Sequence, residues 1–496
     1  MTATSFRRSI LTAFLATATI ASTTPSLAQT KAARPVSGVD KVEGDKAVAL
    51  LKTLIAFDTT NAPGDTRAIA AYLKTLFDAA GIPNEIILAP NGKAAHFIAR
   101  LKGDGSQKPV LLAAHTDVVP VQKERWSVDP FAGVEKDGFV YGRGALDNKG
   151  AVATFARAVI RLSQDPKPRT RDVIFLAEAD EEQGTFNTGW LADTHWDKID
   201  AEFSLNEGGH TVWGPDGSVR EMQVSYADKL TLNLKIKTDG PTGHSSRPLP
   251  INQSANGQLI TALAKLQTYE TDVLISPEIR TYLTAKAKIS PAPVATAIDT
   301  LLAAKDGPSS KAAARDLVAG GWGAEGLMRN TLVITMINAG QKPNVIPGNA
   351  EAVLNARLLP GQTVDAFIAE LTQVIDNPKV EIEIVNARPK AEISAFYAKR
   401  SKIAPSSLDT ALYRSIEKSA AKTWPGVAIL PTLLVASTDA TPWRERAVPV
   451  YGIGPVPADA DTISRIHGDD ERAGVEEIRQ GEAFVYGILR DITARK

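Results

Sequence analysis

The spacing of apolar positions changes twice along the chain. Between about residues 42 and 226, stretches with helical spacing, such as 66–81 and 148–165, alternate with short apolar runs, such as 109–117 and 172–182. We expect the helix at 66–81 to follow Asp65 as its N-cap. Short continuous apolar runs are typical of strands buried on both faces, so this region predicts an α/β sheet.

A different pattern begins near residue 229. Residues 230–240 alternate strictly between apolar and polar side chains, which is typical of a half-exposed antiparallel strand. Similar runs and intervening helical stretches follow, and the first pattern returns near residue 409. We therefore predict an α+β domain at 228–398, inserted into an α/β domain formed by 38–227 and 399–496. Residues 270–328 within it read as a long Ala-rich helical insertion.

The N-terminus has the features of a secretory signal. Arg7 and Arg8 precede an apolar stretch at 10–20, and Ser26-Leu27-Ala28 forms a small-x-small cleavage site. We interpret residues 1–28 as a cleaved signal peptide and expect an exported, periplasmic protein without a membrane anchor. Both the ordinary secretory route and twin-arginine export stay open, because the paired arginines suit the latter.

Composition excludes several kinds of protein. Lys plus Arg and Asp plus Glu both number 56, so the net charge is zero and gives no electrostatic basis for a nucleic-acid partner. The chain has no Cys, which excludes thiolate nucleophiles and Cys-ligated zinc. The six His residues are the remaining nitrogen ligands for a metal.

Several carboxylates follow predicted strands. His115, Glu181, Glu182 and Glu207 lie at the carboxyl ends of predicted strands, and Asp147 precedes a predicted helix, where alone it would read as an N-cap. In an open α/β sheet these ends face one crevice. Carboxylates gathered there need cations, so the pattern predicts two zinc ions with nitrogen and oxygen ligands and one bridging carboxylate.

Five motifs give this pattern a family resemblance. "HTDVVP", "GRGALDNKG", "EADEEQG", "NEGG" and "IHGDDER" occur in this order. They resemble the di-zinc metallopeptidase family of aminoacylase-1, carboxypeptidase S, glutamate carboxypeptidase, acetylornithine deacetylase and succinyl-diaminopimelate desuccinylase. The resemblance covers nearly all of the mature chain. It implies an α/β catalytic domain with a central mixed sheet, interrupted by a ferredoxin-like α+β lid and dimerisation domain.

The resemblance also assigns metal ligands. His115 and Glu207 would bind one zinc, Glu182 and His467 the other, and Asp147 would bridge both through a loop with a cis peptide bond. Each subunit would thus hold two Zn²⁺, with Co or Mn as alternatives decided by availability.

Catalytic roles follow from the same resemblance. Asp117 would orient His115, and Glu181 would be the general base that takes a proton from the metal-bridging water and later gives it to the leaving nitrogen. His244 in the inserted domain would stabilise the oxyanion, often across a dimer interface. Asp180 has no assigned role.

Further positions resemble substrate contacts. We expect them at Asn344, Arg357, Ser437 and Gly454, with Gly452 as an alternative to Gly454. Many members have Arg where this chain has Thr441, so that contact is lost or moves to Arg444.

The other candidates have structural explanations. We expect His96 in a strand, His195 at the surface or between domains, and His210 as a non-ligand. We also expect the acidic segment 469–472 to begin the last helix.

Together these features predict an exported zinc-dependent hydrolase of the metallo-aminoacylase or carboxypeptidase type. It would cleave amide or peptide bonds next to a free carboxylate, in N-acyl amino acids or short peptides. The alternatives are a deacylase for one exported metabolite and a catalytically inactive zinc- or ligand-binding protein. The second is disfavoured by Glu181, because a binding protein has no need of a carboxylate that is not a ligand.

Overall fold

The computed structural model describes residues 36, 38–182, 184–214, 216–319, 325–386, 388–436 and 438–495. The predicted signal peptide at 1–28 and the substrate-binding candidate Ser437 lie outside the described residues. Among the residues described, no helix combines the length and the apolar character needed to cross a membrane.

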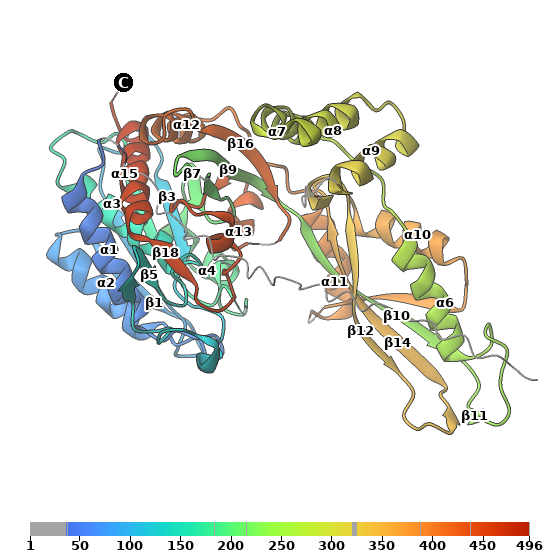
Figure 1. The fold of residues 1–496 in the computed structure, drawn as a ribbon. Helices are drawn as coiled ribbons and strands as arrows, with labels where there is room; N and C mark the ends of the chain where they lie inside the picture. Colours follow the sequence, from blue (N-terminus) through green and yellow to red (C-terminus); the bar gives the residue numbers. More distant parts are fainter. Residues whose placement is uncertain are drawn as a thin grey trace, which may run out of the picture. The chain divides into compact units, whose positions relative to one another are not determined.

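A mixed sheet, nine-stranded in the described residues, is the centre of the α/β part (Figure 1). Its strands follow the order β1-β2-β6-β3-β7-β17-β9-β16, with β8 paired to β9. Strands β6, β3, β7 and β17 are parallel neighbours, as are β9 and β16, and the other pairings are antiparallel. The strands are β1 (Asn84–Leu88), β2 (Ala95–Leu101), β3 (Val110–His115), β6 (Val173–Glu178), β7 (Phe203–Asn206), β8 (Thr211–Trp213), β9 (Val219–Asp228), β16 (Ala428–Leu434) and β17 (Val450–Gly452).

The central strands are buried on both faces, as their apolar runs predict. In β3, Leu112 and Ala114 belong to one hydrophobic cluster and Leu111 and Ala113 to another, because successive side chains point to opposite faces. The first cluster packs under α1 (Lys41–Ile55), α2 (Arg67–Ala79), α3 (Lys149–Ser163), α12 (Ala411–Thr423) and α15 (Val475–Ile492). The second packs under α4 (Thr188–Thr194), α5 (Trp196–Ile199) and α13 (Thr441–Arg444).

One helix begins one residue later than expected. The N-cap of α2 is Thr66, and Asp65 instead accepts a hydrogen bond from the backbone N–H of Arg67 at 3.2 Å and pairs with its guanidinium. The prediction of Asp65 as the N-cap was therefore wrong by one position.

A small three-stranded sheet joins distant parts of the α/β domain. It consists of β4 (Val134–Lys136), β5 (Phe139–Tyr141) and β18 (Arg472–Gly474), with β5 in the middle. Because Tyr141 pairs with Arg472, the loop after β5 lies beside the segment before β18. Short helices η1 (Lys123–Arg125) and α14 (Ala460–Ile463) complete this part.

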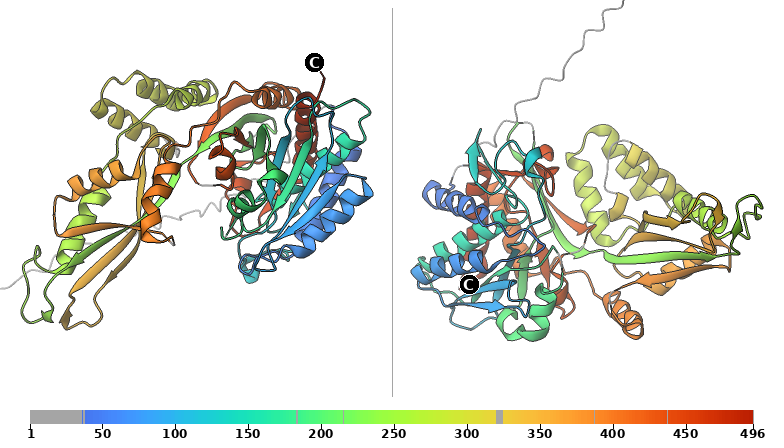
Figure 2. Two further views of the ribbon diagram at one scale, coloured as in Figure 1. Left: turned by 180° about the vertical axis from the view of Figure 1, so that it is seen from behind. Right: turned by 90° about the horizontal axis from the view of Figure 1, so that it is seen from below.

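The inserted part has the predicted ferredoxin-like fold. Its sheet follows the antiparallel order β12-β14-β10-β15, and the chain order β10-α6-β12-β14-α10-β15 is the ferredoxin-like βαββαβ arrangement. Helices α6 and α10 pack against each other and share one core with the sheet, as Figure 2 shows from two further sides. The elements are β10 (Leu230–Asp239), α6 (Ala255–Thr268), β12 (Thr331–Ala339), β14 (Asn349–Leu358), α10 (Val364–Ile375), β15 (Val380–Val385) and α11 (Lys390–Arg400).

Two additions complete the inserted part. Between α6 and β12, the predicted helical insertion is present as α7 (Pro277–Ile289), α8 (Ala292–Ala303), α9 (Gly307–Ala319) and η2 (Glu325–Leu327). A short ladder joins β11 (Gly243–His244) to β13 (Val345–Ile346). The domain boundaries at 228 and 398 stay predictions.

Candidate metal centre

Four candidate residues follow three neighbouring strands of the central sheet. His115 ends β3, Glu181 and Glu182 lie in the loop after β6, and Glu207 follows β7. Since β6, β3 and β7 are adjacent and parallel, their carboxyl ends meet at one edge. The sheet therefore brings these side chains to one place although 92 residues separate the first from the last.

The other two candidates come from the segments joined by the small sheet. Asp147 lies after β5, and His467 lies before β18 with a positive φ of 61°. The peptide bond between Asp147 and Asn148 is cis, as the resemblance implies.

Asp147 faces two imidazoles with its two carboxylate oxygens. Oδ1 lies 2.9 Å from Nε2 of His115, and Oδ2 lies 3.2 Å from Nε2 of His467. Each imidazole nitrogen has a second carboxylate neighbour: Glu207 Oε2 lies 3.3 Å from His115, and Glu182 Oε1 lies 3.3 Å from His467. The result is two sets of candidate ligands that share one carboxylate.

The surrounding charges shift the pKa of both imidazoles. Hydrogen bonds to Asp147 and Glu182 raise the pKa of His467 to about 10. Burial opposes protonation of His115, but the charge of Glu207 and the hydrogen bond to Asp147 raise its pKa well above the ordinary value. The raised pKa values favour protonated imidazoles at His115 and His467 in the absence of a metal. Because a metal binds the deprotonated nitrogen, metal binding there would release protons.

The donor set fits two divalent cations. Two imidazole nitrogens and two carboxylates, those of Glu182 and Glu207, surround the shared Asp147, and imidazole with carboxylate is a ligand combination that zinc takes. His115, Asp147 and Glu182 offer atoms within 4.8 Å of one another, and so do His115, Glu181 and Glu207.

Glu181 differs from the ligand candidates because neither imidazole bonds to it. Burial raises the pKa of its carboxyl to about 8, and the charge of Glu207 adds to this effect. A carboxylate of raised proton affinity beside a metal site is suited to proton transfer near neutral pH.

Asp117 holds the loop after β6. Its backbone oxygen accepts a hydrogen bond from His115 Nδ1 at 2.9 Å, whereas its carboxylate is 3.8 Å from that nitrogen. The carboxylate instead accepts the backbone N–H groups of Glu181 (3.2 Å) and Glu182 (3.1 Å). The expected orientation of His115 is thus made by the backbone of Asp117, while its side chain positions Glu181 and Glu182.

Asn61 and Asp180 complete this support and had no expected role. Asn61 Nδ2 donates to Asp117 Oδ2 at 2.8 Å and to Asp180 Oδ1 at 3.0 Å. Asp180 also accepts the backbone N–H of Phe186 at 2.6 Å. Asp180 therefore closes the loop that carries Glu181.

Glu471 is the largest departure from the sequence prediction. Segment 469–472 does not begin the last helix, because β18 intervenes and α15 starts at Val475. The fully buried Glu471 pairs with Arg143 at 2.6 Å and accepts the backbone N–H groups of Gly144 (3.0 Å), Leu146 (2.9 Å) and Asp147 (3.0 Å). One carboxylate therefore fixes the loop that carries the shared ligand.

A cavity of about 580 Å³ adjoins these residues. Gly454 lies in its wall, where a Cβ would come 2.5 Å from the Gly209 backbone oxygen, so the close approach of these segments requires glycine. Apart from the acids and imidazoles described above, the wall carries no charged side chain among the described residues. Its large apolar side chains are Leu146, Leu434, Ile453, Val456, Ile463 and Ile466.

The candidates of the inserted part do not line this cavity. His244 is exposed and bonds through Nδ1 to Ser246 Oγ at 2.9 Å. Asn344 is also exposed, and its backbone oxygen accepts a hydrogen bond from the N–H of Ser245. Arg357 is half-buried in β14 and donates to Thr231 Oγ1 at 2.7 Å.

The expected substitute for the arginine that many members have at position 441 does not line this cavity. Arg444 is buried and pairs with Asp228 at 2.5 Å. Its contact with substrate stays a prediction.

The other histidines lie as expected, with one addition. His96 is buried in β2, where Nε2 bonds to the Phe186 backbone oxygen at 2.8 Å. His195 is half-buried and occupies the N-cap position of the short helix α5 without a side-chain hydrogen bond to it. His210 lines the cavity but belongs to neither set of ligands.

Known proteins match this chain over most of its length. Residues 111–491 match the model of peptidase family M20/M25/M40. The chain belongs to this family. Among relatives of the M20-family chain, the Bos taurus N-fatty-acyl-amino acid synthase/hydrolase PM20D1 is 27% identical over 432 residues, which cover 85% of this chain and 81% of the relative.

Solved structures show the same fold. The M20 family metallo-carboxypeptidase Sso-CP2 from Sulfolobus solfataricus has a TM-score of 0.65 at 18% identity, with 90% of this chain and 99% of the other covered. The Bacillus subtilis YXEP protein, a dinuclear metal binding peptidase of the M20 family, has a TM-score of 0.56 at 13% identity, with 91% and 98% covered. The M20-family chain is thus a hydrolase of the metallo-aminoacylase or carboxypeptidase type, from a family with dinuclear metal sites.

Proposed function

We propose that this protein is an exported two-zinc hydrolase that cleaves the amide bond next to a free carboxylate and prefers N-acyl amino acids with an apolar acyl group. The observation that carries the proposal is Asp147, whose two oxygens face His115 and His467 beside the cavity and Glu181. Co or Mn could replace zinc in the same ligand set.

The ligands divide into two sets. His115 and Glu207 would hold one metal, Glu182 and His467 the other, and Asp147 both. When bound, the two metals would polarise the substrate carbonyl and make water acidic enough to attack at neutral pH.

Glu181 would move the proton. It takes a proton from the attacking water, keeps it while the amide carbon is tetrahedral, and returns it to the leaving nitrogen. The C–N bond then breaks, and the products are the acyl carboxylate and the amino acid. The raised proton affinity of Glu181 supports this role.

The cavity wall supports an apolar acyl group. Beyond the acids and imidazoles, most of its side chains are aliphatic or small, and the polar Asn148 and Thr211 already donate to Glu207 and to the Gly454 backbone oxygen. Such a wall would exclude water from an alkyl chain and offers no Lys or Arg to a charged acyl group such as succinyl. The similarity to an N-fatty-acyl-amino acid synthase/hydrolase agrees with this preference. Short peptides with apolar N-terminal residues are the second candidate class, because their side chains could occupy the same wall.

The inserted domain would complete the site from a partner copy. We propose that His244 stabilises the oxyanion, while Asn344, Arg357 and the backbone near Ser437 contact substrate. Edge strand β12 supports a homodimer, because Val333, Met336 and Ile337 are about two-thirds exposed there (58%, 66% and 63%). An exposed apolar sheet edge is a surface on which a second copy can add its own strand.

Steady-state assays with the purified protein test the function. N-decanoylglycine should be hydrolysed faster than N-succinylglycine and faster than glycylglycine. Chelation should abolish the activity, and added zinc should restore it. Unchanged turnover after verified removal of both metals would overturn the mechanism, and a preference for N-succinylglycine would overturn the substrate class.

Export is tested separately. The mature protein from a periplasmic extract should begin at Gln29, because cleavage is expected after Ala28. A chain that keeps its first residues and stays in the cytoplasm would contradict export without affecting the proposed chemistry.

A further inference from the structure

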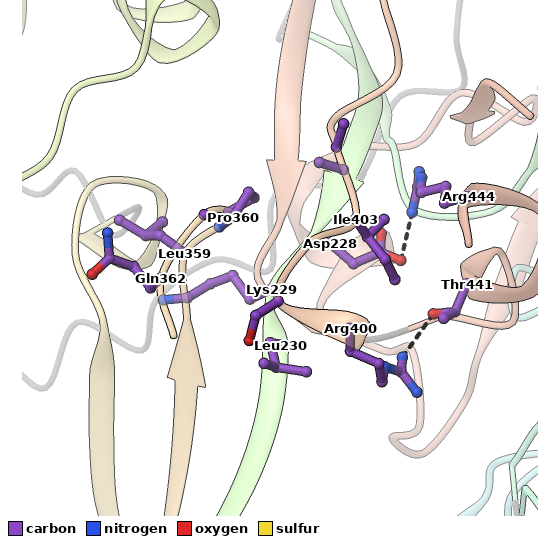
Figure 3. A pocket seen from close by; sticks show the side chains of 14 residues that line it. Asp228, Lys229, Leu230, Leu359, Pro360, Gln362, Arg400, Ile403, Thr441 and Arg444 are labelled. Atoms are coloured by element: carbon purple, nitrogen blue, oxygen red, sulfur yellow. Dashed lines mark hydrogen bonds and ion pairs between the residues drawn. The ribbon is translucent and has the colours of Figure 1, made fainter. Parts of the chain in front are cut away.

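A second cavity lies where the two linkers between the α/β part and the inserted part meet, and we propose that it binds a monocarboxylate with an apolar tail, such as a medium-chain fatty acid. Figure 3 shows the charged end of this site, with Leu359, Pro360 and Gln362 on one side and Arg400 and Ile403 on the other. The proposal does not depend on the function proposed above.

The larger chamber of this site is apolar. It has a volume of about 290 Å³, which is in the lower range for small-molecule sites. Glu278 and Lys402 also line it and offset each other in charge. The chamber's apolar side chains come from the helical insertion, the inserted domain, the linkers and the central sheet, and they include Tyr226, Leu274, Ile279, Leu327, Ile403 and Leu433.

A smaller chamber of about 40 Å³ adjoins the first and carries the charge. The two chambers share the wall segments 359–361, 401 and 403–404. Arg400 lines the smaller one and donates through Nη2 to Thr441 Oγ1 at 2.9 Å. A tail in the large chamber could therefore place its carboxylate beside a guanidinium.

Arg400 is the cation that this site leaves for a ligand. In the part of the chain that the structure describes, no carboxylate lies within ion-pair distance of it, although burial lowers the pKa of its guanidinium. The nearest acids have other partners, since Asp228 pairs with Arg444 at 2.5 Å and Glu445 with Lys399 at 2.7 Å. A partly desolvated guanidinium without a counter-ion favours an anion that it can bind in a bidentate manner.

Lys229 also lines the smaller chamber, but its ammonium already has hydrogen-bond partners. Lys229 Nζ donates to the backbone oxygens of Gly326 at 3.0 Å and Arg329 at 2.7 Å. Its ammonium therefore holds η2 in place. Since Arg444 pairs with Asp228, Arg400 is the cation of the smaller chamber that remains for a ligand among the described residues. One cation beside an apolar chamber selects one carboxylate and one apolar tail.

A ligand here would touch both linkers at once. Residues 227–230 lead from β9 into β10, and residues 401–404 lead from α11 back to the α/β part. Occupancy would favour the linker conformation that forms the site and would thereby shift the population of inserted-domain positions. The expected effect is a change in the rate of hydrolysis by a compound that does not compete with substrate.

Calorimetric titration of the zinc-loaded protein with decanoate tests the site. We expect Arg400→Gln to weaken one class of decanoate binding at least tenfold, and decanol to bind that class poorly in the unmodified chain. The matched control is Arg388→Gln. Arg388 stacks on Phe396 at 4.3 Å, the same ring that Arg400 approaches at 5.3 Å, but it does not line the site.

A second variant separates binding from folding. Leu274 is 39% exposed and lines the apolar chamber, so Leu274→Trp should fill the chamber without disturbing the core and should also abolish this class of binding. Repeating the titration with N-decanoylglycine in a Glu181→Ala background tells whether free fatty acid or intact acyl amino acid is preferred. Wild-type decanoate affinity and stoichiometry in both Arg400→Gln and Leu274→Trp would overturn the proposal.

Discussion

The side-chain nitrogen of Asn61 lies 2.8 Å from Asp117 Oδ2, and this contact fixes the carboxylate that holds the backbone of Glu181 and Glu182. Asn61 touches neither the proposed metals nor the substrate cavity, so it acts by positioning the residues that do. Supporting contacts of this kind commonly change activity or metal affinity by about 10–100-fold.

Asn61→Ala should therefore lower kcat by about 10–100-fold and leave KM nearly unchanged, because the base loop loses its anchor while the cavity wall stays intact. Steady-state kinetics and metal content measure both effects. Asn91→Ala is the matched control, since the exposed Asn91 accepts the backbone N–H groups of Lys93 and Ala94 in a turn and does not line the cavity. Equal losses in both variants would contradict a positioning role.

Glu181→Gln should lower kcat by about 10²–10⁴-fold while both metals remain bound, because the amide cannot accept a proton but keeps the shape of the side chain. Elemental analysis and turnover on N-decanoylglycine measure these properties. The neighbouring Glu182→Gln should instead lose metal, since Glu182 lies 3.3 Å from His467 Nε2. Full turnover in Glu181→Gln would show that another residue is the general base.

Glu471→Gln should destabilise the protein by about 3 kcal/mol and reduce its metal content, because Arg143 would stay buried without a counter-charge. Urea unfolding and elemental analysis report the two effects. Asp470→Asn is the adjacent control, because Asp470 binds Ser127 at the surface, and it should change stability by less than about 1 kcal/mol. Wild-type metal content in Glu471→Gln would show that the loop does not need this clamp.

Stability should fall as pH rises from about 5 to 7, in part because of Glu482. Burial raises the pKa of its carboxyl from 4.5 to about 7, against the opposing charge of Arg161. Between these values the folded state binds a proton that the unfolded state has lost, so the free energy of unfolding falls by at most about 1.4 kcal/mol per pH unit and levels off above pH 7.

Glu482→Gln cannot titrate and should show a flatter profile over that range. Urea midpoints at pH 5, 6, 7 and 8 measure the difference. Glu476→Gln, in the first turn of the same helix, should keep the wild-type slope. Parallel profiles for Glu482→Gln and the unmodified chain would contradict the shift.

Mixing two inactive variants should restore activity if the inserted domain serves a partner's site. In a dimer of one His244→Ala and one Glu181→Ala chain, one site has both groups, so random exchange should recover about a quarter of wild-type activity. Turnover after mixing, with subunit exchange checked by light scattering and labelled chains, measures this. Full activity in a strictly monomeric preparation would exclude sharing.

The fold and the candidate ligands could be predicted from the sequence because both depend on patterns within short segments of the chain. Apolar runs mark buried strands, strict alternation marks the ferredoxin-like sheet, and His115, Glu182 and Glu207 each follow a strand whose end faces the same edge. Topology then brings them together without knowledge of any single contact.

The supporting contacts could not be predicted because they depend on partners far along the chain. Glu471 reads locally as an acid near a helix start, and only its pairing with Arg143, 328 residues away, reveals a buried clamp. Asn61 reaches Asp117 across 56 residues from a loop without periodicity. The choice between the backbone and the carboxylate of Asp117 as the partner of His115 is a matter of rotamer, which no pattern of residue types encodes.

The distance along the chain between His115 and His467 has a consequence for biogenesis. A nascent chain cannot offer both sets of ligands until ribosomal synthesis has passed residue 467 and the last helix has packed. If export proceeds unfolded, the protein must acquire its cations after translocation, from the pool outside the cytoplasm. If it proceeds by the twin-arginine route, folding and loading come first, and the cytoplasmic pool decides which metal is carried across. The export route would therefore decide which compartment supplies the metal.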